Sequence, residues 1–104
     1  GLANAVVTPD VEPDCTSVWA QYTVRVQDRA TVVARMKDAG VPTTIHYPRA
    51  LHQQEAFIET ARLVTAVPNS ETAAAEVLSL PMHPYLSEAD QVKVVAALAA
   101  AVRG

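Results

Sequence analysis

Several residue types are scarce in this sequence, and each scarcity excludes a class of protein. The 104 residues include a single cysteine, so no internal disulfide can form. A lone thiol favours a reducing compartment, and we expect a cytoplasmic protein. Two of the three glycines stand at the chain ends, so no glycine-rich loop is available to hold a phosphate group.

Long apolar runs and strong charge are scarce too. No apolar stretch approaches the roughly 20 residues that a membrane-spanning helix needs, so we expect no membrane partner. The first residues also lack the basic start and apolar run of a signal peptide. The net charge is −3 and no basic face stands out, which argues against a nucleic-acid partner. Hydrophobic residues make up 50% of the chain, enough for the core of one small domain.

The first half of the sequence predicts a strand, a helix and a second strand. Residues 1–17 are rich in proline and acidic side chains, which is typical of an extended connector. Residues 18–26 alternate between two sets of side chains, and a period of two predicts a strand with one buried face. A helix follows Asp28 as its N-cap and ends at Gly40. Residues 43–47 then predict the second strand.

The second half predicts further helices and one more strand. Residues 52–62 favour a short helix, and residues 70–77 favour another. Residues 78–80 predict a brief third strand. Ser87, with Asp90 three residues on, approximates a capping box at the start of the final helix. The expected fold class is therefore α/β: a two-layer sandwich in which about three short strands are covered by helices.

Ring side chains concentrate in two segments that proline interrupts, residues 45–52 and 78–86. All three histidines and two of the three tyrosines lie there, at the ends of predicted strands, where binding residues are common. His46 and Tyr47 are adjacent, so one ring can pack while the other projects. Nearby Arg49 could meet a phosphate or a carboxylate. The residues alone leave both a binding role and simple packing open for this pair.

Other kinds of active site are disfavoured. The spacing of the three histidines matches no zinc signature, so we predict no metal site. Cys15 lies among acidic residues, the wrong surroundings for a reactive thiolate. Ser79 has no glycine elbow around it and is expected to be structural. We predict no catalytic residue in this chain.

A set of motifs nevertheless occurs in a fixed order. It consists of SVWAQYTVRV at residues 17–26, Asp28-Arg29, AGVPT at 39–43, His46-Tyr47-Pro48 with Leu51-His52-Gln53, and LSLPMHPYLSEAD at 78–90. In this order and spacing the motifs resemble the C-terminal part of the DegT/StrS family of sugar aminotransferases. These are fold-type I enzymes that use pyridoxal 5'-phosphate to aminate keto-sugars carried on nucleotides. The SVWAQYT run is most similar to the branch acting on UDP-linked 3-keto-uronic acid derivatives in polysaccharide biosynthesis.

The resemblance implies that residues 18–104 are the small domain of a larger enzyme, with residues 1–17 as its connector. The missing N-terminal large domain would hold the Schiff-base lysine and most of the phosphate cup. Neither Lys37 nor Lys93 stands in a family cofactor motif. The isolated chain is therefore expected to bind no pyridoxal phosphate and to be inactive. Its start at Gly1, without a methionine, also suggests a fragment, a processed chain or a remnant of a tag.

The resemblance also assigns roles to the histidine segment. His46 and Tyr47 would bind the nucleotide-sugar substrate, often in the pocket of the neighbouring subunit, so we expect a homo-oligomer. His52 is a further substrate-binding candidate. Two departures from the family pattern are Ala50, where relatives usually have a second proline, and residues 61–69, which lack a Gly-Asp-aromatic stretch. The alternative is a freestanding interaction or oligomerisation module with the same fold and no catalysis.

Overall fold

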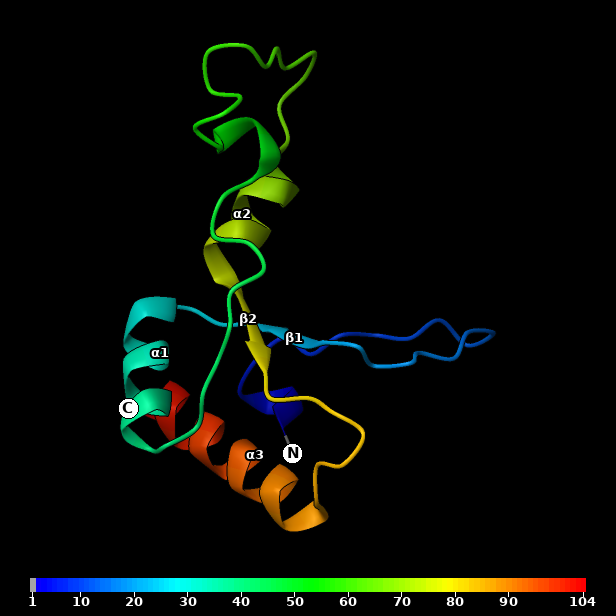
Figure 1. Ribbon diagram of the computed structural model, residues 1–104, viewed down its shortest axis with the longest axis vertical. Coiled ribbons are helices and arrows are strands. Elements are labelled where there is room, and N and C mark those ends of the chain that lie inside the picture. The colour runs from blue at the N-terminus through cyan, green and yellow to red at the C-terminus, as the bar shows by residue number, and fades with distance from the viewer. Residues whose placement is uncertain (1) are drawn as a thin grey trace.

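Two short antiparallel strands lie at the centre of the structure, a computed structural model that describes residues 2–104 (Figure 1). β1 and β2 pair so that Tyr22 lies opposite Leu80 and Arg25 lies opposite Val77. The elements in chain order are η1 (Leu2–Asn4), β1 (Tyr22–Arg25), α1 (Arg29–Asp38), η2 (Leu51–Gln53), α2 (Pro68–Glu76), β2 (Val77–Leu80) and α3 (Glu88–Arg103). The predicted α/β class is confirmed.

The sheet has two strands within residues 2–104, not the three that the sequence predicted. In the expected second strand only Thr44 pairs, through an isolated bridge to Ser79. Pro42 and Pro48 flank that segment, and proline has no N–H with which to extend a ladder. The expected first strand is also shorter, because Trp19 adopts a φ of 48°, a left-handed conformation that breaks an extended run.

The core lies where the sheet meets α1 and α3. Val24 of β1 and Leu78 of β2 are opposite each other in the register. Both are fully buried, together with Met36 of α1 and Leu98 of α3. Burying a side chain of this size contributes about 1.5–3 kcal/mol. The two helices lie against each other (Figure 1), and Arg35 of α1 donates from Nη1 to the carbonyl of Ala101 at 2.7 Å.

The residues predicted to cap the helices behave differently in the structure. Ser87 caps α3 as predicted: its Oγ accepts from the backbone N–H of Asp90 at 3.1 Å. Gly40, with a φ of 73°, follows the end of α1, the left-handed position at which glycine is favoured. Asp28 does precede α1, but its backbone is left-handed and its side chain makes no capping hydrogen bond. Asp28 therefore occupies the predicted N-cap position, but without the hydrogen bond that a side-chain cap would make.

The helix expected over residues 52–62 is reduced to the single turn η2 followed by further turns. The stability of a helix in a protein comes mostly from packing an amphipathic face. Phe57 and Ile58, the large apolar residues of this stretch, are 44% and 66% exposed. They have little within residues 2–104 to pack against, which accounts for the absence of a helix beyond η2 in this stretch.

Two extensions leave the body formed by the sheet, α1 and α3 (Figure 1). We call residues 8–21 the N-terminal arm and residues 50–76, which end in α2, the central arm. The central arm joins the body directly, because α2 ends at Glu76 and β2 begins at Val77. Before the N-terminal arm, Leu2 and Val6 are buried in the core. The start of the expected connector therefore packs against the body.

Candidate functional site

His46 lies beside an open cavity at one end of the sheet. Thr44, two residues earlier, is fixed by its bridge: its N–H donates to Ser79 at 3.1 Å, and the N–H of Ser79 donates back at 2.7 Å. The cavity has a volume of about 290 Å³ and is lined by Ala20, Gln21, Pro42, Thr44, His46, Ser79, Leu80, Pro81 and Met82. The structure thus brings together the start of both proline-interrupted segments.

Ser79 supports this cavity from the core. Its side chain is 5% exposed, and its Oγ lies 2.8 Å from Oγ1 of Thr23 on the neighbouring strand. With its backbone also paired to Thr44, Ser79 has the structural role that the sequence predicted. Gln21, which the sequence analysis did not single out, adds an exposed amide to the cavity wall. Its position just before β1 could have pointed to it.

His46 and Tyr47 differ in how much of each ring is accessible. His46 is half-buried at the cavity, whereas Tyr47 is 68% exposed. Their ring centroids are 5.4 Å apart and the planes meet at 74°, with a cis peptide bond between the two residues. Tyr47 projects further than His46, but the two rings meet edge to face and so do not point to the opposite faces expected of adjacent residues at a strand end. Arg49 is exposed beyond them.

His52 is not part of this cavity. It lines a separate one of about 320 Å³ within the central arm, together with Phe57, Leu63 and Val67. Its Nε2 lies 2.9 Å from Oε1 of Glu71, and the His52 side chain is 18% exposed. Nothing in the spacing of His52 and Glu71 along the sequence indicated this pairing.

The third histidine, His83, lies in the second proline-interrupted segment, where it is open to solvent. His83 is exposed, and its Nδ1 accepts from the N–H of Tyr85 at 3.2 Å. Tyr85 itself is 90% exposed. Packing within the chain therefore does not account for these two rings.

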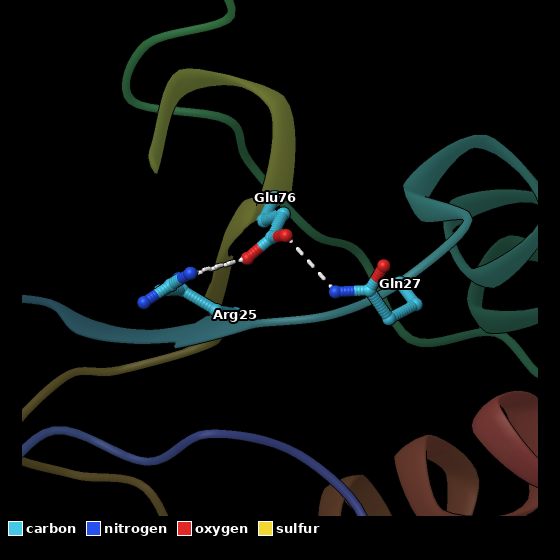
Figure 2. Close-up of polar contacts among 3 residues, drawn as sticks. All are labelled: Arg25, Gln27 and Glu76. Atoms are coloured by element: carbon cyan, nitrogen blue, oxygen red, sulfur yellow. Dashed lines mark hydrogen bonds and ion pairs between the residues drawn. The ribbon is translucent and has the colours of Figure 1, made fainter. Parts of the chain in front are cut away.

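Glu76 fastens the base of the central arm to the body (Figure 2). Its Oε2 accepts from Nε and Nη2 of Arg25, at 2.9 and 2.7 Å, and its Oε1 accepts from Nε2 of Gln27 at 2.9 Å. The hydrogen bonds from Arg25, and then that from Gln27, lower the pKa of the Glu76 carboxyl. Arg29 also donates from Nη1 to the carbonyls of Ala74 and Val77, a favourable place for a cation at the end of α2.

The described residues do not fit a pyridoxal phosphate site. The two lysines, Lys37 on α1 and Lys93 on α3, are exposed, and neither lines the cavity at His46. Between residues 2 and 104, no three metal-ligating side chains gather in one place, and Cys15 is an exposed thiol. None of the helices in that part of the chain has the length and apolar character to cross a membrane.

The sequence profile of the DegT/DnrJ/EryC1/StrS aminotransferase family matches residues 1–99. The chain belongs to this family. One similar relative is the UDP-2-acetamido-2-deoxy-3-oxo-D-glucuronate aminotransferase of Pseudomonas aeruginosa. It is 48% identical over 91 residues, which cover 86% of this chain and 24% of the relative. The predicted family resemblance is confirmed.

Solved structures of the same family share the fold. A DegT/DnrJ/EryC1/StrS aminotransferase from Brucella abortus is 35% identical and superposes with a TM-score of 0.89. The match covers 99% of this chain and 28% of the Brucella chain. DesV of S. venezuelae, solved with a ketimine intermediate, is 30% identical with a TM-score of 0.90 and the same coverages. The chain therefore spans little more than a quarter of the length of these family members.

Proposed function

We propose that this chain is the C-terminal small domain of a pyridoxal-phosphate-dependent aminotransferase that aminates a keto-sugar nucleotide. In this proposal residues 18–104 form the domain and residues 1–17 lead into it from the large domain. The observation that carries the proposal is the placement of His46 at a cavity lined by polar groups, with Tyr47 projecting beside it. Family membership supplies the class of reaction.

The substrate class follows from the relative with 48% identity, whose name specifies a UDP-linked 3-oxo-glucuronate. We assign the same class, a UDP-linked 3-keto-uronic acid derivative used in polysaccharide biosynthesis, to the parent enzyme. Such a substrate carries phosphates and a carboxylate. Arg49, exposed next to Tyr47, is suited to bind either group because its guanidinium can donate two parallel hydrogen bonds.

His46 and Tyr47 would act by binding and orientation. Hydrogen bonds from the imidazole and the phenol would hold the sugar so that its keto group meets the amino donor in one geometry. Pyridoxal phosphate supplies the electron sink for transamination, and it would be held by the large domain, because residues 2–104 offer no lysine beside the cavity. The isolated chain is thus inactive, and the assembled enzyme is a cytoplasmic homo-oligomer whose sites are completed across subunits.

A chimeric enzyme tests this assignment. The matching segment of the P. aeruginosa aminotransferase is replaced by this chain, and steady-state kinetics are measured with the UDP-3-keto-uronate substrate. His46→Ala and Tyr47→Phe are each expected to raise KM about three- to tenfold, the value of one lost hydrogen bond. His83→Ala and Tyr85→Phe are matched controls and should leave KM unchanged. Unaltered KM values in both test variants would rule out substrate contact at this site.

The alternative, a freestanding interaction or oligomerisation module, draws on the exposed apolar residues of both arms. Val18 and Val64 are 93% and 96% exposed, which suits contact with another surface. A chimera that folds and assembles but shows no turnover, while the parental enzyme is active under the same conditions, would favour this alternative.

A further inference from the structure

The segment that carries His46 and Tyr47 is held at its two ends. Before it, Thr44 is bridged to Ser79 and Ile45 packs against the core. Within residues 2–104, no hydrogen bond reaches the backbone of residues 46–48. The Tyr47 ring contacts His46, but the backbone that carries both rings is held only through the two ends of the segment.

That far end is fixed by η2. Ala50 is buried, its N–H donates to Oε1 of Gln53 at 3.0 Å, and the N–H of Gln53 donates back to Ala50 at 2.9 Å. These hydrogen bonds, with one from Nε2 of Gln54 to the carbonyl of Arg49 at 3.4 Å, lie within residues 49–54 and order η2 only locally.

His52 supplies the attachment. A carboxylate only accepts hydrogen bonds, so Nε2 of His52 must donate to Oε1 of Glu71 across 2.9 Å. Glu71 lies in the first turn of α2, and α2 continues without a loop into β2. The pair thereby links the end of the Tyr47 segment back to the sheet from which that segment departs.

We propose that His52 and Glu71 are positioning residues, which together set the location of Tyr47 for substrate binding. This inference rests on the proposed function. It replaces a direct substrate contact by His52, whose Nε2 is already engaged and whose ring lines a different cavity from that of His46. Without the pair, the far end of this segment keeps only the burial of Ala50 and the local hydrogen bonds of residues 49–54, and ordering Tyr47 on binding then costs additional conformational entropy.

Kinetics of the same chimera distinguish positioning from direct contact. His52→Ala and Glu71→Ala are each expected to raise KM about three- to tenfold with kcat within about twofold. The double variant should do no more than the stronger single one, because the two residues act as one unit. His52→Gln, whose amide can still donate to Glu71, should restore most of the affinity. If Glu71→Ala leaves KM unchanged while His52→Ala raises it, His52 contacts substrate and the proposal fails.

A measurement on the 104-residue chain tests the positioning itself, without substrate. Backbone ¹⁵N order parameters at Tyr47 and Arg49 should fall from about 0.85 toward 0.6 in His52→Ala and Glu71→Ala. His52→Gln and the control Glu59→Ala, a change at an exposed site on the same arm, should retain the original values. Circular dichroism checks that each variant is folded. If His52→Ala does not fold, Glu71→Ala and His52→Gln still test the role of the pair.

The two readouts separate this inference from the proposed function. Unchanged order parameters in both alanine variants would overturn the positioning role, even if His46→Ala and Tyr47→Phe raise KM. The opposite outcome is that His52→Ala and Glu71→Ala lower the order parameters while His46→Ala and Tyr47→Phe leave KM unaltered. The pair would then still hold the Tyr47 segment in place, but the proposed substrate contact would be removed.

Discussion

The body and the central arm differ in how far they bury their large apolar residues, although α3 of the body also leaves Val92 63% exposed. In the body, Val24, Met36, Leu78 and Leu98 are fully buried and hold the two strands, α1 and α3 together. In the central arm, five large apolar side chains lie 44–96% exposed: Leu51, Phe57, Ile58, Leu63 and Val64. The contrast indicates that the body folds on contacts within this chain. The arm leaves its large apolar side chains exposed within residues 2–104.

The largest expected effect tests the body. Leu98→Ala removes a fully buried side chain of α3 and should lower the free energy of unfolding by about 2–5 kcal/mol, because a cavity remains in the core. Chemical denaturation of the isolated chain measures the change. Val64→Ala in the arm, at a side chain that is 96% exposed, is the matched control and should alter stability by less than about 0.5 kcal/mol. Equal effects at the two sites would contradict the division between body and arm.

Self-association tests the arm. The isolated chain is expected to associate through exposed apolar surface, as seen by sedimentation velocity at increasing concentration. Ile58→Lys combined with Val64→Lys should weaken that association about tenfold or more, since each residue contributes apolar contact area. Glu59→Lys is the control, because Glu59 is an exposed residue of the same arm that presents no apolar side chain. A strictly monomeric wild-type chain at high concentration would show that the arm does not bind a second copy.

The smallest effect concerns the joint between the two regions. Because the pKa of Glu76 is lowered in the folded chain by Arg25 and Gln27, its contribution to stability is present above the ordinary carboxyl pKa. It is lost as pH falls through the lowered value. Glu76→Gln should therefore destabilise the chain near pH 7, with a difference that shrinks on acidification. The effect is modest because Arg25 is 44% exposed.

Denaturation curves between pH 7 and pH 3 measure this difference. Glu55→Gln changes an exposed carboxylate outside the two ion pairs of the described residues and serves as the control. A Glu76→Gln difference that stays constant with pH would mean that the charge of Glu76 does not stabilise the joint.

The sequence predicted those features whose structure depends on neighbouring residues, and it failed where the structure depends on distant contacts. The cap of α3 at Ser87 and the end of α1 at Gly40 depend on residues within one turn, and both were predictable. The predicted second strand, over residues 43–47, depends on pairing with a distant segment, and that pairing is limited to the bridge from Thr44 to Ser79. The helix expected over residues 52–62 needed a packing surface that residues 2–104 do not supply, and the local sequence alone does not reveal that lack.

The candidate site divides in the same way. The sequence indicated the exposed position of Tyr47 because proline interrupts the segment after Thr44, whereas the edge contact between the rings of His46 and Tyr47 depends on the backbone conformation. Their role in substrate binding stays a prediction. The partnership of His52 with Glu71 spans 19 residues and depends on how the arm folds back along α2. The approach of Gln21 to His46 likewise depends on tertiary structure, since the two residues come from different segments of the chain.

Because α2 ends at Glu76 and β2 begins at Val77, the rotation of α2 about its own axis is fixed relative to the sheet. A helix turns about 100° per residue, while each step along a strand reverses the face to which a side chain points. One residue inserted at this junction would swing the far end of α2 roughly a quarter-turn around its axis, carrying Glu71 away from His52. With no loop to absorb the change, the number of residues between Glu71 and the sheet is itself a geometric constraint.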